Sequence, residues 1–156
     1  MTVQPSGDRQ RRIVVGVDGS ASSKAALAWA VRQARLTGAV VEAVTAWEFP
    51  AAYGYPVPVL DTDFEELATR TVKDAIAEVI AGADAGSIRY KVVEGNAAKI
   101  LIDESAGADL LVVGSRGHGG FVEALLGSTG RHAVHHATCP VVVIRDSAAS
   151  PRRPSR

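Results

Sequence analysis

The chain has 156 residues, with 17 basic and 17 acidic side chains and 47% apolar residues, a size and composition typical of one compact globular domain. No stretch approaches the roughly 20 consecutive apolar residues that a membrane-spanning helix needs, and residues 1–12 lack the apolar core of a secretory signal. The single cysteine, Cys139, excludes an internal disulfide and a cysteine-rich metal cage. We therefore expect a cytoplasmic domain that is stabilised by packing and makes no contact with membranes.

The balanced total charge conceals an uneven distribution along the chain. The two ends are rich in arginine, whereas acidic residues outnumber basic ones between residues 13 and 144. Because an acidic body does not favour broad contact with a phosphate backbone, we expect no nucleic-acid partner. The polar ends, residues 1–11 and 147–156, are expected to be disordered basic tails on either side of one domain that spans residues 12–146.

The first part of the chain predicts a buried strand followed by a helix. Residues 13–17 form an unbroken apolar run, which is typical of a strand buried on both faces. Ser20, Ser22 or Ser23 can cap the helix that follows, and Gly38 is a suitable residue to end it. This pairing of elements is the first half of a strand-helix-strand unit.

The next segment contains a second strand, a loop, a long helix and a third strand. Residues 40–47 contain enough β-branched side chains to predict a strand, whereas residues 48–60 contain several prolines and are expected to be a loop. The aromatic residues of this loop make it a candidate lid. Residues 61–81 have the apolar spacing of an amphipathic helix, and residues 88–93 predict a strand.

The remaining elements continue the alternation. Asn96 can cap a helix that runs to residue 106, residues 109–113 predict a fourth strand, and a helix at 128–137 precedes a fifth strand at 140–145. Apolar strands that alternate with helices predict an α/β fold, in which a parallel sheet is covered on both faces by right-handed crossovers. Ligands of such sheets bind at the carboxyl ends of the strands, near a topological switch point.

The densest functional signal follows the fourth predicted strand, which ends at Val113. Gly114-Ser115-Arg116-Gly117 is separated by nine residues from Gly127-Ser128-Thr129, which opens a helix. Gly114 and Gly117 permit positive φ and close approach of a ligand, so the amides of residues 115–118 are predicted to form an anion-binding nest. Gly127 and Ser128 would present free amides at a helix amino terminus, where the dipole favours an anion. Two such clusters suit a polyphosphate better than a carboxylate.

Each of these features also has a simpler interpretation. The glycines can serve only to shape a tight turn, and Ser128 can serve only to cap a helix. Arg116 and His118 either contact phosphate or lie exposed to solvent. His132 and His136 share a helix face, but no third ligand of matching spacing follows them, so we expect no metal site.

The glycine motif resembles that of the universal stress proteins, in the branch that binds ATP. That branch carries Gly-x-x-Gly, nine residues, then Gly-Ser/Thr. The resemblance extends to Gly16-Val17-Asp18 at the end of the first predicted strand and to Cys139-Pro140 before the last one. It covers roughly residues 12–145 and implies a single doubly wound sheet of five parallel strands in the order 3-2-1-4-5, with helices on both faces.

The resemblance also implies a set of nucleotide-binding residues. It places Asp18 at the adenine end of ATP, with Gly16 and Val17 on the same wall and Ala46 offering its backbone to the base. An ionised Asp18 would repel phosphates but can accept a hydrogen bond from an amine or a ribose hydroxyl; alternatively, it caps the following helix. The implied residues are Gly16, Val17, Asp18, Ala46, Val113, Gly114, Ser115, Arg116, Gly117, His118, Gly127, Ser128 and Thr129.

The function implied by the resemblance is that of a nucleotide-responsive stress or signalling protein. Its cofactor would be ATP, with or without Mg²⁺, and a cyclic nucleotide is the alternative ligand. Slow ATP hydrolysis, or self-phosphorylation at Ser128 or Thr129, is the alternative activity. The family commonly pairs its fifth strand with a second copy, and an apolar edge strand at Val141–Ile144 would favour such a homodimer.

Other classes of nucleotide protein are disfavoured by missing motifs. The chain has neither Gly-x-x-x-x-Gly-Lys-Ser/Thr nor Gly-x-Gly-x-x-Gly, which argues against P-loop NTPases and dinucleotide enzymes. Pyrophosphatase-type ligases need Ser-Gly-Gly-x-Asp-Ser after the first strand, where this chain has Asp18-Gly19-Ser20. A ligand-free scaffold is a third reading, against which the intact glycine motif argues.

Overall fold

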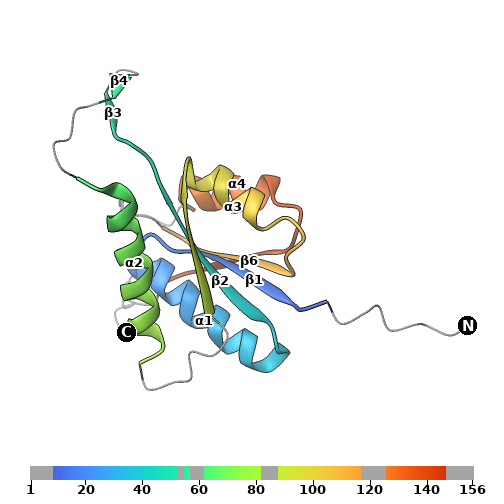
Figure 1. Ribbon diagram of the computed structural model, residues 1–156. Coiled ribbons are helices and arrows are strands. Elements are labelled where there is room, and N and C mark those ends of the chain that lie inside the picture. The colour runs from blue at the N-terminus through green and yellow to red at the C-terminus, as the bar shows by residue number, and fades with distance from the viewer. Residues whose placement is uncertain (1–8, 53–54, 57–61, 82–87, 117–125, 147–156) are drawn as a thin grey trace, which may run out of the picture.

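A central sheet of five parallel strands forms the body of the domain (Figure 1). The computed structural model describes residues 9–52, 55–56, 62–81, 88–116 and 126–146. The strands of the sheet are β1 (Arg12–Gly16), β2 (Val40–Trp47), β5 (Ile88–Glu94), β6 (Leu110–Gly114) and β7 (Val141–Ile144). They lie in the order β5-β2-β1-β6-β7, so the predicted order 3-2-1-4-5 is confirmed.

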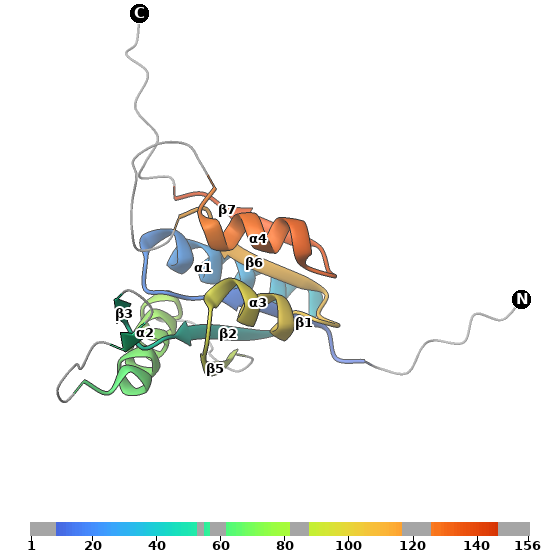
Figure 2. The same ribbon diagram turned by 90° about the horizontal axis from the view of Figure 1, so that it is seen from above.

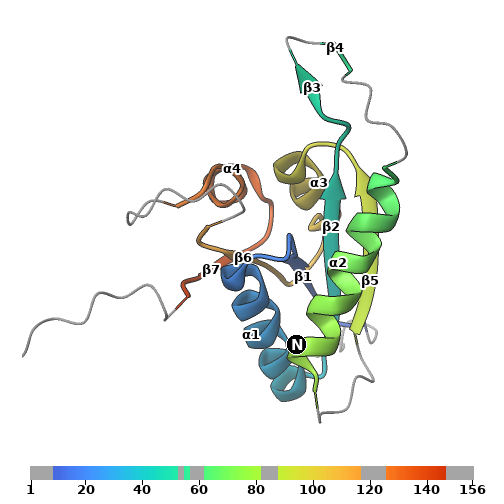
Figure 3. The ribbon, with the colours of Figure 1, turned by 90° about the vertical axis from the view of Figure 1, so that its left-hand side faces the viewer.

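Helices cover both faces of this sheet. α1 (Ala21–Thr37) and α2 (Phe64–Val79) pack on one face, and α3 (Ala97–Glu104) and α4 (Ser128–His136) pack on the other (Figures 2 and 3). This arrangement confirms the doubly wound α/β fold. Among the helices in the described ranges, none combines the length and the apolar character that crossing a bilayer requires.

The local signals in the sequence explain where these helices begin and end. The Ser20 side chain accepts a hydrogen bond from the amide of Ser23 at 3.3 Å and caps α1, and Gly38, with φ of 72°, ends that helix. Asp63 and Asn96 cap α2 and α3 in the same way. Capping side chains therefore set three of the four helix starts in the described residues.

The core consists of two apolar layers, one on each face of the sheet. Successive side chains of a strand point to opposite faces, so Ile13 and Val15 pack toward α1 and α2, while Val14 packs toward α3 and α4. Leu27 is buried in the first layer and Leu111 in the second. This two-sided burial is the reason why the strands appear in the sequence as continuous apolar runs.

The segment after β2 differs from the sequence prediction. Residues 48–60 were predicted to be a loop, but β3 (Ala51–Ala52) and β4 (Tyr55–Pro56) form a short antiparallel pair. Proline has no backbone N–H to donate, so a ladder that contains Pro56 stays short and leaves no alternating pattern to recognise. The proposed lid also includes Tyr53, which lies outside the described residues.

Charged side chains from β1 and β5 gather at the carboxyl end of α3. The guanidinium group of Arg12 donates to the carbonyl oxygens of Glu104 and Ala106 at 2.9 and 3.0 Å, at the carboxyl end of α3. Lys91 Nζ lies 2.7 Å from a Glu104 carboxylate oxygen, and this hydrogen bond raises the pKa of Lys91. These contacts tie α3 to β1 and β5 and so stabilise the fold.

Part of the predicted amino-terminal tail contacts the carboxyl end of α1 and the turn that follows α3. Arg9 donates to the carbonyl oxygen of Gly107, and Arg11 lies 3.3 Å from the carbonyl oxygen of Thr37, where α1 ends. Arg11 thus provides a donor for a carbonyl group that α1 leaves without a helical partner at its carboxyl end, and Arg9 for one in the turn that follows α3. The rest of the two predicted tails lies outside the described residues.

Candidate functional site

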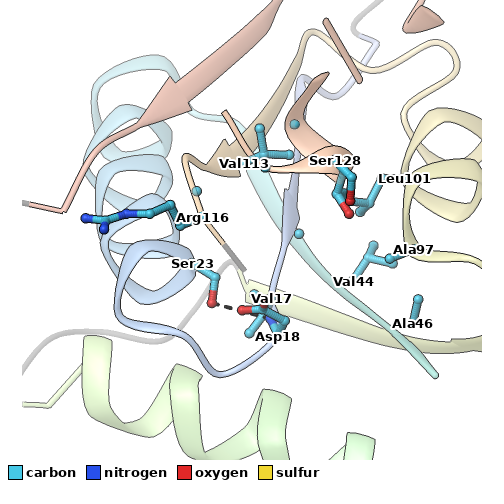
Figure 4. A pocket seen from close by; sticks show the side chains of 15 residues that line it. Val17, Asp18, Ser23, Val44, Ala46, Ala97, Leu101, Val113, Arg116 and Ser128 are labelled. Carbon is cyan, nitrogen blue, oxygen red and sulfur yellow. Dashed lines mark hydrogen bonds between the residues drawn. The ribbon is translucent and has the colours of Figure 1, made fainter. Parts of the chain in front are cut away.

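A pocket of about 340 Å³ opens at the carboxyl ends of β1, β2 and β6 (Figure 4). β1 and β6 are neighbours in the sheet, but the chain leaves β1 toward α1 on one face and reaches α4 on the other face after β6. The point between them is the topological switch point, where sheets of this kind form a crevice. The pocket therefore lies where the order of the strands predicts a ligand site.

Most of the residues predicted for the site meet in this pocket. Those that line it are Gly16, Val17, Asp18, Ala46, Val113, Gly114, Arg116, Gly127, Ser128 and Thr129. Ser115 does not line it, because its amide is turned toward β7 and donates to the carbonyl oxygen of Ile144 at 2.8 Å. Gly117 and His118 lie outside the described residues.

One end of the pocket is an apolar slot that the sequence analysis missed. Val44 and Ala46 from β2 line it together with Ala97 and Leu101 from α3, and Val44 is drawn beside Ala97 in Figure 4. Gly16 allows Leu101 to approach β1, because a Cβ at Gly16 would lie 2.7 Å from Leu101 Cδ1. The spacing of Ala97 and Leu101, four residues apart at the start of a helix, places both on one face and was the signal available in the sequence.

The other end of the pocket is polar and lies at the start of α4. Ser128, Thr129 and Gly130 line this end of the pocket. The first hydrogen bond within α4 is made by the Arg131 amide, which donates to the Gly127 carbonyl oxygen at 2.9 Å. The amides before that bond have no acceptor within the helix, and the helix dipole adds partial positive charge there. Gly127 occupies the capping position, so the alternative in which Ser128 caps α4 is wrong.

Three of the amides predicted to bind an anion, those of Ser115, Arg116 and Gly127, are hydrogen-bonded within the protein. The amide of Ser115 bonds to Ile144, the amide of Arg116 bonds to Ser22 Oγ at 3.3 Å, and the amide of Gly127 bonds to the Ser115 carbonyl oxygen at 2.9 Å. These amides are thus committed to neighbouring elements and are not free to bind an anion. The prediction was wrong for them because residues distant in the sequence supply their acceptors.

The structural reason for a glycine at position 114 also differs from the predicted one, which was a backbone with positive φ. Positive φ occurs at Gly19, Gly38, Gly95 and Gly107 among the described glycines, and not at Gly114. A Cβ at Gly114 would instead lie 2.7 Å from the carbonyl carbon of Ser22 and 2.8 Å from the Ser23 amide nitrogen. Gly114 is therefore required for the close approach of α1 to β6, and not for a left-handed turn.

Asp18 lies on the pocket wall and orders the turn before α1. One of its carboxylate oxygens accepts a hydrogen bond from the Ser20 amide at 2.9 Å, and its own amide lies 3.3 Å from Ser23 Oγ (Figure 4). The capping residue of α1 is Ser20, so Asp18 does not cap the helix itself. The carboxylate supports the turn that leads into the helix, in the manner of an Asx turn.

Little of the positive charge at this site comes from side chains. The charged residues among those lining the pocket are Asp18 and Arg116, and the Arg116 side chain extends away from Ser128 (Figure 4). His132 is exposed on α4, with Nδ1 3.0 Å from the Ser128 carbonyl oxygen. In the part of the chain that is described, no three His, Cys, Asp or Glu side chains lie close enough together to hold a metal ion.

Comparison with known proteins places this architecture in a family. A family model described as the universal stress protein family matches residues 10–145. A universal stress protein of Mycolicibacterium smegmatis is 36% identical over 153 residues, in an alignment that covers 90% of this chain and 51% of the relative. A second relative, from Mycobacterium bovis, is 31% identical, and the match covers 50% of its length. The chain spans about half the length of the curated relatives it matches.

Solved structures show the same fold. The universal stress protein UspA from Lactobacillus plantarum superposes with a TM-score of 0.70 at 29% identity, covering 88% of this chain and 99% of the other. A universal stress protein in complex with cAMP gives a TM-score of 0.67 at 26% identity, covering 90% and 98%. With a family model that matches residues 10–145 and solved structures of the same fold, the chain belongs to the universal stress protein family.

Proposed function

We propose that the protein binds ATP in the pocket between β1, β2, β6 and the start of α4, and that it acts as a nucleotide-responsive stress or signalling protein. The observation that carries this proposal is the division of the pocket into an apolar slot and a polar end. A purine base needs apolar walls, whereas phosphates need hydrogen-bond donors and positive potential. Both requirements are met within one pocket at the switch point of the sheet.

The two ends of the pocket suggest how the nucleotide would lie. The base would occupy the slot between Ala46 and Leu101, and the phosphates would lie at residues 128–130. Asp18, which carries a negative charge, would then face the base or the ribose and not the phosphates. The structural relative that was solved with cAMP supports adenine nucleotides as the ligand class, and a cyclic nucleotide is the second candidate for this site.

We propose binding rather than rapid catalysis as the output. The lining residues in the described part of the chain supply hydroxyl groups at Ser128 and Thr129, but no histidine or lysine is among them to act as a base. His132, whose Nδ1 lies 3.0 Å from the Ser128 carbonyl oxygen, is not one of the lining residues. Any hydrolysis or self-phosphorylation would therefore be slow, with turnover below about 1 s⁻¹, the low end of ordinary enzymes.

Equilibrium dialysis with ATP labelled on the γ-phosphate tests both statements in one experiment. We expect saturable binding of one ATP per chain, with or without Mg²⁺, displacement by unlabelled cAMP, and negligible release of labelled phosphate. Absence of saturable binding would contradict the proposed ligand. Release of phosphate faster than about 1 s⁻¹ would contradict the binding role and favour the enzyme.

We also propose that the protein forms a homodimer through β7. In the described ranges β7 pairs with β6 alone, so its other edge presents unpaired backbone groups beside four apolar residues, Val141–Ile144. Such an edge favours pairing with another strand. Sedimentation at micromolar concentration is expected to give twice the chain mass of 16.3 kDa. A mass of 16.3 kDa alone would contradict the dimer.

A further inference from the structure

The backbone around Arg116 is held from α1, an element that lies far away in the sequence. Ser22 is the second residue of α1 and is 4% exposed. Its hydroxyl group donates to the Arg116 carbonyl oxygen and accepts from the Arg116 amide at 3.3 Å. A single hydroxyl can make both bonds, since it has one donor and two acceptor lone pairs. Both peptide groups that flank the Cα of Arg116 are thereby fixed.

This contact depends on how closely α1 approaches the end of β6. Gly114 leaves room for the backbone of Ser22 and Ser23, which a Cβ would meet at less than 3 Å. Ser20 adds a longer contact, with Oγ 3.4 Å from the same Arg116 carbonyl oxygen. The start of α1 and the segment after β6 therefore form one packed unit.

The same helix start is tied to the opposite wall of the pocket. The Ser20 amide donates to Asp18 Oδ1, and Ser23 Oγ lies 3.3 Å from the Asp18 amide (Figure 4). Asp18 and Arg116 both line the pocket. A continuous set of hydrogen bonds thus runs from the wall proposed for the base or ribose to the segment that carries the glycine motif.

We propose that Ser22 is a positioning residue. It holds the peptide group between Ser115 and Arg116, whose carbonyl oxygen accepts a hydrogen bond from the Gly127 amide at 2.9 Å, and it thereby fixes the start of α4 at the phosphate end of the pocket. Ser22 does not line the pocket itself and acts through Arg116. Because both peptide groups around Arg116 are fixed before a ligand enters, less ordering is required when the phosphates bind. This inference rests on the proposed nucleotide function for its effect on affinity, but the holding of Arg116 can be measured without any nucleotide.

The test is Ser22→Ala, with Ser105→Ala as the matched control. Ser105 is 0% exposed and its hydroxyl donates to the Ile102 carbonyl oxygen at 3.0 Å, so the control removes an equally buried hydroxyl at the end of α3. Calorimetry is expected to show about a three- to tenfold loss of ATP affinity in Ser22→Ala, as for one lost hydrogen bond. Affinity for adenosine, which has no phosphate, is expected to stay within about twofold. Ser105→Ala is expected to lower the melting temperature and leave the ratio of the two affinities unchanged.

Hydrogen exchange of the Arg116 amide in the nucleotide-free protein supplies the second readout. Faster exchange in Ser22→Ala than in wild type and in Ser105→Ala is expected, because the amide loses its acceptor. Unchanged exchange would overturn the inference, as would equal losses of ATP and adenosine affinity. If wild type binds neither ligand, the proposed function fails, and the exchange rate alone decides whether Ser22 holds Arg116.

Discussion

Gly114→Ala is expected to cause the largest combined loss of stability and nucleotide binding of any single methyl addition at the site. The new Cβ would lie 2.7 Å from the Ser22 carbonyl carbon and 2.8 Å from the Ser23 amide nitrogen, and both are backbone atoms that cannot rotate away. α1 must then move from β6, at a cost of about 1–3 kcal/mol in the free energy of unfolding. Denaturant unfolding measures this loss. Calorimetry is expected to show ATP affinity reduced by about tenfold or more, because the same movement displaces Ser22 and Arg116.

Gly38→Ala separates this effect from general backbone strain. Gly38 has φ of 72°, and a Cβ there would meet no atom within 4 Å. The variant is therefore expected to lose about 1 kcal/mol of stability through its left-handed conformation, with ATP affinity unchanged. If Gly114→Ala matched wild type in both measurements, the close contact between α1 and β6 would not be part of the site.

The second large effect is expected from Ala97→Leu, which fills the apolar slot. Ala97 is a partly exposed residue at the start of α3 and lines the pocket together with Val44 and Ala46. A leucine there would occupy the space proposed for the base, and ATP affinity measured by calorimetry is expected to fall by at least about tenfold, the scale of one well-placed apolar group. The free energy of unfolding is expected to change by no more than about 0.5 kcal/mol.

Ala77→Leu is the matched control for this substitution. Ala77 is an exposed residue of α2, on the face of the sheet opposite α3. It receives the same added side chain, so any general effect of a larger, more apolar residue appears in both variants. ATP binding as tight in Ala97→Leu as in Ala77→Leu would show that the base does not occupy the slot.

Local patterns in the sequence were sufficient to predict the α/β class and most of the strands and helices. Buried strands such as residues 13–17 and 40–47 are continuous apolar runs, and Ser20, Gly38 and Asn96 mark helix boundaries by chemistry that acts within a few residues. The order of the strands came from the resemblance to the family. The pair β3 and β4 was missed because each of these strands is only two residues long, which is too short to show an alternating pattern of apolar and polar residues.

The chemical detail of the site depended on contacts between distant segments. The amides of Ser115 and Arg116 look free in the sequence, but β7 and α1 supply their acceptors. Leu101 faces the pocket only because Gly16, on another element, leaves room for it. Sequence spacing therefore located the glycine motif, whereas the geometry between elements determined which of its groups can meet a ligand.

The source of positive potential at the site was likewise not predictable from sequence spacing. The sequence left open whether the Arg116 side chain contacts phosphate or lies exposed to solvent, and in the structure that side chain extends away from Ser128 (Figure 4). The anion-binding potential proposed here comes instead from the amides at the start of α4 and from the helix dipole. This account attributes phosphate binding to the backbone of residues 128–130, where the pocket is polar.

A crystal structure of the protein grown with saturating ATP tests this account most directly. We expect the adenine ring between Ala46 and Leu101, with the phosphates accepting hydrogen bonds from the amides at the start of α4. Electron density for ATP at another surface, or an empty pocket at a concentration that saturates binding in solution, would contradict it.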